Sequence, residues 1–431
     1  MKAYRTFTNQ LILVSVTIGC LLLLGLLFKT DAATNGFGIF LEFLLCICYF
    51  TNCWIRGLHK LKSYKFFTNQ ALFVCAVCVA LSFLSQIFNM GSIANATYAF
   101  SLMFVCGCYV LSGCYTRLML FLTVMLVISM TLKGITMNAD YFSHGIIAIC
   151  TYVCLEVGSA IKIDVKTFKR ISVVFLLTVI ILFVFYYLGP LKSSTFANTS
   201  AVALNLSNPN AASLWLVCIF ILLFYFGLIY RKTLRYIFMI CAFGILPIVL
   251  ATESRNSFLA CIFLIGSVIF VKLFKIKKLP NWVLAVLTCL PLIVLFFYMY
   301  VIVENIDFWE NVLSLNIADK SLDSRQSVWG SALKNFWDCF LIGDYPYYFD
   351  SQPHNSLLTV YCRFGVFATI AVCVLIYRTL KKLQENSSIF AVLSLSAVLF
   401  TGCFEASVFV GIAGLYLMLL IIPACSSVEQ I

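Results

Sequence analysis

Charged residues are scarce in this sequence. Only 11% of the 431 residues are charged, whereas 63% are hydrophobic, and a soluble domain carries roughly a quarter charged residues. Apolar stretches recur along the whole chain and approach the length of about 20 residues that a helix needs to cross a bilayer. The composition therefore excludes a soluble globular enzyme and predicts a single integral membrane domain over residues 1–431.

The sequence also lacks the motifs of nucleotide and zinc chemistry. It contains no P-loop, no dinucleotide-binding fingerprint and no HExxH motif. Close cysteine pairs such as Cys46 and Cys48 have no histidine or aqueous loop beside them, so zinc-ligand spacing is not matched. All 20 cysteines except Cys339 fall in apolar segments, where a thiol behaves as a small hydrophobic group. We therefore expect no metal, no cofactor and no disulfide framework.

The apolar stretches predict an all-α polytopic protein of about 14 transmembrane helices. The predicted spans are residues 10–28, 37–55, 66–88, 95–115, 118–136, 145–161, 171–189, 211–230, 236–252, 256–274, 281–303, 356–377, 388–404 and 407–425. The first of them is long enough to span and lacks a clear cleavage site, which favours a retained helix over a signal peptide. An even number of spans places both termini on one side of the membrane.

The basic residues test this topology. The formal net charge of +12 would suggest nucleic acid in a soluble protein, but here the cations follow the loops. Of 29 Lys and Arg, 21 fall in loops on one side of the predicted topology and seven on the other, with Arg363 inside a span. Short cytoplasmic loops retain Lys and Arg during insertion. The pattern therefore predicts cytoplasmic termini and no nucleic-acid partner.

One large external loop is predicted at residues 304–355. Within it, residues 325–341 place apolar side chains on one stripe, which predicts an amphipathic helix along the membrane surface. Arg325 stands in its first turn, after Asp323 or Ser324 as N-cap, where free backbone N–H groups favour an anion. Arg325 is therefore a candidate phosphate ligand. The alternative is an ion pair with Asp323 or snorkelling at the interface.

Two further external residues are candidates for chemistry. Arg255 lies in the short turn ATESRNS, against the positive-inside bias, so it needs either Glu253 as a neutralising partner or a phosphate that fits its bidentate fork. His354 lies in QPHNSLL, where the large loop re-enters the membrane. Its ordinary pKa near 6.5 suits it to accept a proton from a sugar hydroxyl, and a structural role is the alternative.

Charged residues within the predicted spans are a third group. Charge in a bilayer is costly and marks functional candidates; here these are Glu42, Glu156, Arg363 and Glu405. Arg363 is about nine residues into its helix, about 13 Å deep, within reach of the external cavity. Glu405 falls between the last two spans, where contact with water is a simple alternative.

Four segments in order then resemble a known family. They are ATESRNSFLA (251–260), SLDSRQSVWGSALKNF (321–336), IGDYPYY (342–348) and PHNSLLTVYCRFGVFA (353–368). Together, over residues 235–380, they resemble the bacterial O-antigen ligase and polymerase superfamily. The turn IGDYPYY has fewer glycines than the family usually shows, and Arg363 is not part of the family pattern.

This resemblance implies a GT-C-like membrane fold and metal-independent transfer of glycans from undecaprenyl diphosphate, at the periplasmic face of the inner membrane. It implies that Arg255 and Arg325 bind the diphosphate of the lipid-linked oligosaccharide and stabilise the departing charge. His354 would orient or deprotonate the acceptor hydroxyl. Arg363, Glu253 and Asn355 are further candidates for this site.

Three activities remain open at this point. A polymerase uses a lipid-linked repeat unit as acceptor, whereas a ligase uses the lipid A-core. The external side holds seven cations against twelve acids, which slightly favours the polymerase because the lipid A-core is densely phosphorylated. A chain-length regulator is a candidate partner. A transporter or flippase is less favoured, since such proteins place titratable groups at the bilayer midplane within repeated, broken helices.

Overall fold

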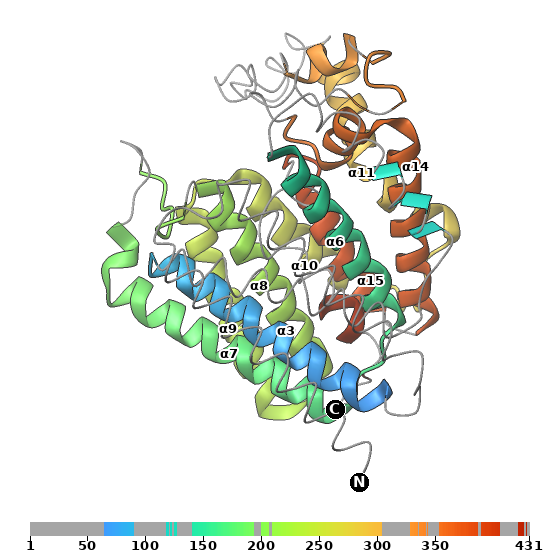
Figure 1. The fold of residues 1–431 in the computed structure, drawn as a ribbon. Coiled ribbons are helices and arrows are strands. Elements are labelled where there is room, and N and C mark those ends of the chain that lie inside the picture. Colours follow the sequence, from blue (N-terminus) through green and yellow to red (C-terminus); the bar gives the residue numbers. More distant parts are fainter. Residues whose placement is uncertain are drawn as a thin grey trace, which may run out of the picture. The chain divides into compact units, whose positions relative to one another are not determined.

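The computed structural model describes residues 64–89, 118–119, 121–122, 125–126, 140–193, 200–206, 209–303, 328–334, 336–341, 343, 353–386, 389–405, 421–425 and 428. The regular elements among these residues are helices, which agrees with the predicted all-α class (Figure 1). The predicted spans 10–28, 37–55 and 95–115 lie outside the described residues, and so do most residues of the predicted spans 118–136 and 407–425. The described residues fall into two compact units.

Nine predicted spans correspond to observed helices. These are α3 (Tyr64–Ile87), α6 (Asp140–Ala160), α7 (Val165–Tyr187), α8 (Pro209–Ile229), α9 (Lys232–Ala251), α10 (Arg255–Leu273), α11 (Asn281–Phe297) with its π-helical continuation η3 (Tyr298–Val303), α14 (Ser356–Glu385) and α15 (Ile389–Thr401). A short 3-10 helix, η2 (Pro190–Ser193), follows α7. Six of the nine helices, α7 to α11 and α14, are long and apolar enough to cross a membrane. The protein is therefore a multi-pass membrane protein, and the total of 14 spans stays a prediction.

The first unit is built around α8. This helix is apolar on every side, and all its residues from Ala211 to Ile229 are buried, as expected for a helix enclosed by neighbours. α9 packs along α8, and α3 packs along α7 (Figure 1). Edge-to-face contact between Phe168 and Phe226, with ring centroids 5.3 Å apart, joins α7 to α8.

In the first unit α3 and α7 run in the same direction and α8 runs opposite to them, which agrees with the order of the predicted spans. At one end, Asp164 N donates to Asn69 Oδ1 at 3.2 Å, and the hydroxyls of Ser172 and Tyr230 lie 2.7 Å apart. These bonds bring together the starts of α3 and α7 and the end of α8. The basic residues at this end include Lys162, Lys166, Lys169, Arg170, Arg231, Lys232 and Arg235. We call it the cation-rich end of the first unit.

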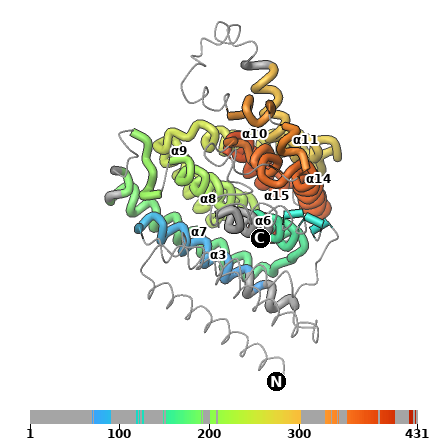
Figure 2. The backbone as a smooth tube through the Cα atoms, turned by 45° about the horizontal axis from the view of Figure 1, so that its top comes forward, coloured from blue at the N-terminus to red at the C-terminus, as the bar shows by residue number. Residues whose placement is uncertain are grey.

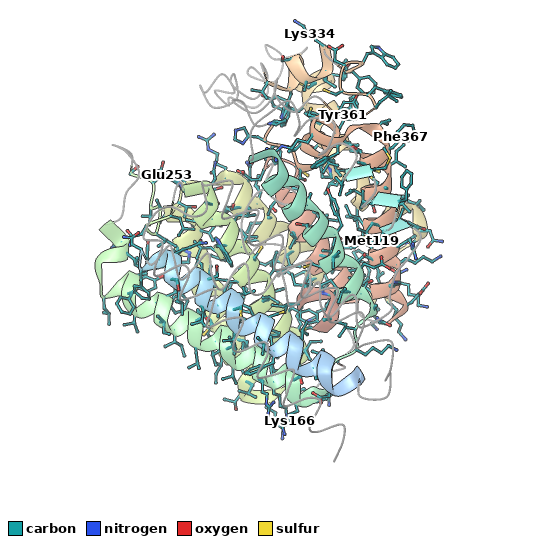
Figure 3. The ribbon with its side chains drawn as sticks, in the orientation of Figure 1. Met119, Lys166, Glu253, Lys334, Tyr361 and Phe367 are labelled. Atoms are coloured by element: carbon teal, nitrogen blue, oxygen red, sulfur yellow. The ribbon has the colours of Figure 1, made fainter. Side chains whose placement is uncertain are left out.

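The opposite end of the first unit carries the short connections. Asn205 Nδ2 donates to the carbonyl of Ile87 at 2.8 Å, and Val202 N donates to the carbonyl of Ala251, also at 2.8 Å. Figure 3 labels Glu253 at this end and Lys166 at the cation-rich end. Two sets of contacts therefore agree with the predicted separation of basic loops from external turns.

The second unit contains α6, α10, α11, α14 and α15. In it, α15 packs against α10, α11 and α14 (Figure 2). Phe263 stacks on Phe400 with ring centroids 5.1 Å apart, and Lys272 Nζ lies 5.6 Å from the ring of Phe390. Rising residue numbers on α10 thus meet falling numbers on α15, so the two helices are antiparallel.

Polar contacts also fix the end of the second unit where α14 ends. The backbone of Leu279 exchanges two hydrogen bonds with the side chain of Gln384, at 2.8 and 3.0 Å. Lys382 Nζ lies 3.7 Å from the Glu156 carboxylate, whose side chain is 3% exposed, and donates to Ser159 Oγ at 3.3 Å. Glu156, one of the charges predicted inside the bilayer, is therefore neutralised by an ion pair at this end.

α14 is interrupted at Gly365, whose backbone adopts φ 83° and ψ −178°. The N–H of Val366 leaves the helical pattern and donates to the carbonyl of Phe340 at 2.8 Å. Gly343, with φ +76°, lies so close that a Cβ added to it would be 2.3 Å from the carbonyl carbon of Arg363. Residues 336–341 and Gly343 therefore dock against the interruption. Gly343 leaves no room for a side chain, and Gly365 adopts a backbone conformation that favours glycine.

This docking corrects the prediction of one amphipathic helix over residues 325–341. Residues 328–334 are helical, but residues 336–341 form turns. The predicted stripe is split: Trp329 and Ala332 are buried, whereas Trp337 and Leu341 are 76% and 60% exposed. The helix ends early because the chain must turn to present the Phe340 carbonyl to α14.

Replacing Gly343 by alanine tests this packing. We expect Gly343→Ala to destabilise the protein by more than about 2 kcal/mol, because the new Cβ has no space and the left-handed backbone disfavours it. For a chain of this length it corresponds to a fall in Tm of roughly 2 °C or more. A thiol-reactive dye on detergent-purified protein would measure it, since Cys339, Cys362 and Cys403 are buried.

Gly266→Ala is the matched control. Gly266 lies within α10, and a Cβ there meets nothing within 4 Å, so Tm should stay the same or rise slightly. Equal Tm values for the two variants would contradict the docking of residues 336–341 and Gly343 on α14.

Candidate functional site

A buried asparagine holds the start of α14. Asn355, fully buried, caps the helix by accepting a hydrogen bond from Leu358 N at 3.0 Å. Its Nδ2 donates to the carbonyls of Pro291 at 2.7 Å and Cys403 at 3.1 Å. One side chain thus joins α14 to α11 and to the turn after α15. Asn355, a candidate site residue from the sequence, has structural contacts on each of its polar atoms.

His354 precedes this anchor. Its backbone has φ 47°, in the left-handed region that few non-glycine residues adopt. The preceding carbonyl, of Pro353, accepts a hydrogen bond from the buried Trp329 Nε1. Because both neighbours in the chain are fixed, the imidazole is held at the end of α14, partly buried, with Nδ1 directed inward.

The turn after α15 is attached to the same segment. The backbone N–H and the hydroxyl of Ser356 both donate to the carbonyl of Gly402, at 2.8 and 2.9 Å. Glu405, three residues further on, is 7% exposed. The alternative that Glu405 simply lies in water is therefore wrong. It is a buried acid on a turn that is bonded to the segment of His354.

Arg255 lies at the same end of the second unit as His354. It is the first residue of α10 and is exposed. Phe263, which stacks on Phe400, is eight residues further along α10, about 12 Å. Since α15 runs antiparallel to α10 and ends at the turn bonded to Asn355, Arg255 and His354 are brought to one end by the topology.

Arg363 is buried, at 5% exposure, two residues before the interruption at Gly365. It is the eighth residue of α14, close to the predicted depth. Its charge interacts with the buried Tyr152 of α6, and its backbone is covered by Gly343. Arg363 therefore belongs to the interior of the second unit.

The remaining predicted residues lie elsewhere. Glu253 is exposed in the first unit, where its carboxylate accepts a hydrogen bond from Ser200 Oγ. Arg325 lies outside the described residues, and its role stays a prediction.

Some contacts of this region escaped the sequence reasoning. The bond from Trp329 to Pro353 and the close approach of Gly402 to Ser356 depend on tertiary packing. The capping role of Asn355 had a local signal, because asparagine directly before a helical segment is a preferred N-cap.

Asn355→Ala tests the anchor. The variant loses the cap, about 1 kcal/mol, and leaves two buried carbonyls without this donor, so we expect a total loss of about 2–4 kcal/mol. The thiol-dye assay would report a lower Tm. Asn281→Ala, at the exposed first residue of α11, should leave Tm within error, and an equal effect of the two changes would contradict the anchoring role.

Comparison with known proteins relates part of the chain to a known family. Residues 240–373, about a third of the chain, match the family model described as O-antigen ligase. The matched region contains α10, α11 and the first part of α14, with Arg255, His354 and Arg363. No curated protein and no solved structure matches the chain. The match contains all four segments that carried the resemblance, and it confirms that this region of the chain is related to the O-antigen ligase and polymerase superfamily.

Proposed function

We propose that the protein is a membrane glycosyltransferase that acts on undecaprenyl-diphosphate-linked glycans at the external face of the bacterial inner membrane. Its proposed reaction is the polymerisation of O-antigen or similar polysaccharide repeat units. The observation that carries this proposal is the O-antigen ligase match over residues 240–373, a region that includes Arg255 and His354. A multi-pass protein of this family has lipid-linked glycan and acceptor substrates in general.

Arg255 and Arg325 are proposed to bind the donor diphosphate. When the acceptor hydroxyl attacks the anomeric carbon, the bond from that carbon to the diphosphate oxygen breaks, and negative charge develops on the leaving undecaprenyl diphosphate. A guanidinium fork pairs with two phosphate oxygens at once. Such a contact strengthens as the charge develops and so lowers the barrier.

His354 is proposed to take the proton from the attacking hydroxyl. A histidine suits this role because its pKa lies near the working pH. The fold supports the assignment, since hydrogen bonds to Pro353 and from Asn355 fix the backbone on both sides of the ring. A left-handed backbone costs of order 1–3 kcal/mol, and such a cost is typical of residues held for function.

The acceptor distinguishes two versions of this proposal. A polymerase extends one lipid-linked glycan with another, and the excess of acids over cations predicted on the external side favours it over a ligase that binds the phosphorylated lipid A-core. The ligase is the second candidate because the matched family model bears that description. Transport is not favoured, since Arg255 and His354 lie at a helix end rather than at mid-length.

Complementation of a deletion strain would test the residues. We expect Arg255→Ala to reduce polymer formation by about 100- to 1000-fold and His354→Asn by at least about 100-fold, measured as surface polysaccharide at equal membrane protein level. Asparagine is chosen at 354 because it tolerates the left-handed backbone. Arg255→Lys should recover only part of the activity, since a lysine cannot form the bidentate contact.

Lys192→Gln is the control, because Lys192 is an exposed cation on η2 of the other unit. It should retain full activity. The catalytic assignment would be contradicted if Arg255→Ala and His354→Asn were both inserted in the membrane and both kept wild-type activity.

The glycolipid profile of the deletion strain would separate polymerase from ligase. Loss of a polymerase should leave lipid A-core bearing a single repeat unit, because a ligase elsewhere still attaches it. Loss of a ligase should leave bare core and long polymer on undecaprenyl diphosphate. The proposal expects the first profile on a size-resolving gel, and the second would contradict the polymerase reading while supporting the family function.

A further inference from the structure

An open groove of about 670 Å³ lies between α3 and α7 at the cation-rich end of the first unit. Its positive charges are Lys166, Lys169 and Arg170, all exposed residues of the first turns of α7. Its apolar walls include Phe73 of α3 and Val173 of α7. The Arg170 guanidinium lies 5.8 Å from the centre of the Phe73 ring, which orients it across the groove.

An apolar stripe continues from the groove along α7. Val173, Leu177, Ile180 and Val184 are spaced as successive turns of one helix face and are 50%, 54%, 46% and 47% exposed. From Val173 to Val184 the stripe spans about 16 Å at 1.5 Å per residue. Half of a bilayer's hydrocarbon core is about 15 Å, so the stripe matches the depth of one leaflet.

From this combination we infer that the groove binds an anionic phospholipid, with the headgroup phosphate against Lys166, Lys169 and Arg170 and an acyl chain along the stripe of α7. Basic pockets between transmembrane helices at the membrane surface bind anionic headgroups. A free phosphate would contact the cations alone, whereas a phospholipid would contact both the cations and the apolar stripe that continues from them. On the predicted topology, this is the cytoplasmic leaflet.

The acid beside the groove leaves its net charge positive. Partial burial of Asp164 raises its pKa, but the hydrogen bond from Thr167 N, at 2.7 Å, and the charges of Lys166 and Arg170 outweigh this and hold the pKa below its usual value. Asp164 is therefore ionised at neutral pH and also occupies the free N–H of the helix start. Three cations against one acid leave a formal charge of +2, which complements a headgroup with one or two negative charges.

Thermal stabilisation of the full-length protein in detergent would test the site. Phosphatidylglycerol should raise Tm, because a ligand that binds only the folded state stabilises it, whereas phosphatidylcholine and inorganic phosphate should not. In Lys169→Gln with Arg170→Gln, the apparent affinity for phosphatidylglycerol should fall by roughly 10- to 30-fold, since each cation near anionic lipid contributes of the order of 1 kcal/mol.

Lys232→Gln with Arg235→Gln is the matched control. It removes one lysine and one arginine from the same end of the same unit, outside the groove, and should respond to phosphatidylglycerol as the wild type does. If the double variant does not fold, Lys166→Gln alone tests the same site, and we expect a smaller loss of apparent affinity for phosphatidylglycerol.

Three results would overturn the inference. They are an equal response of the groove and control variants, a Tm rise with inorganic phosphate as large as with phosphatidylglycerol, and no preference for phosphatidylglycerol over phosphatidylcholine. The first would mean a general charge effect, the second a phosphate site and the third a site for any lipid.

Discussion

The buried amide of Asn355 is the interaction on which the second unit depends. It caps α14 and donates to carbonyls of α11 and of the turn after α15. Inside a membrane protein these polar groups have little water to replace a lost partner, so one side chain that satisfies several of them strongly fixes the helices that it joins. His354 directly precedes Asn355 in the chain, so the hydrogen bonds of Asn355 also fix the position of His354. The same constraint thus sets both the packing of three helices and the position of the proposed base.

The interruption of α14 follows the same rule. Backbone that leaves helical geometry within a spanning segment must find new partners, because unsatisfied N–H and C=O groups are costly in lipid. At Gly365 the partner is the carbonyl of Phe340, and Gly343 allows the approach. Residues 336–341 and Gly343 of the predicted external loop are therefore packed into the second unit. Trp337 and Leu341 stay exposed beside it.

Much of the fold could be predicted because its signals are local. Apolar length predicted the positions of nine helices. Both ends of α10 and the start of α14 lie within one residue of the predicted boundaries, whereas α14 continues eight residues beyond its predicted end at residue 377. The amphipathic segment 325–341 was predicted too long, because periodicity cannot show that Phe340 is needed as an acceptor by Val366. The sequence left two alternatives for Glu405, a charge within the membrane domain or a charge in water, because the hydrogen bonds that join its turn to Ser356 have no local signal. Interactions between distant segments have no local pattern.

The candidate site could be predicted in its residues and only partly in its geometry. Arg255 and His354 were proposed as candidates from their predicted external positions and from the family segments, and their roles stay predictions. The antiparallel packing of α10 and α15 gives a physical reason why they share one end of the second unit. The partners of Asn355 could not be predicted, since its contacts lie 64 and 48 residues away in sequence.

The most direct measurement is glycan transfer by the purified full-length protein, supplied with an undecaprenyl-diphosphate-linked repeat unit in the presence of a metal chelator. The account predicts products of two or more repeat units and release of undecaprenyl diphosphate in equal amount to the bonds formed, with both lost in His354→Asn. Bound donor without any transfer, to a second repeat unit or to lipid A-core, would contradict it.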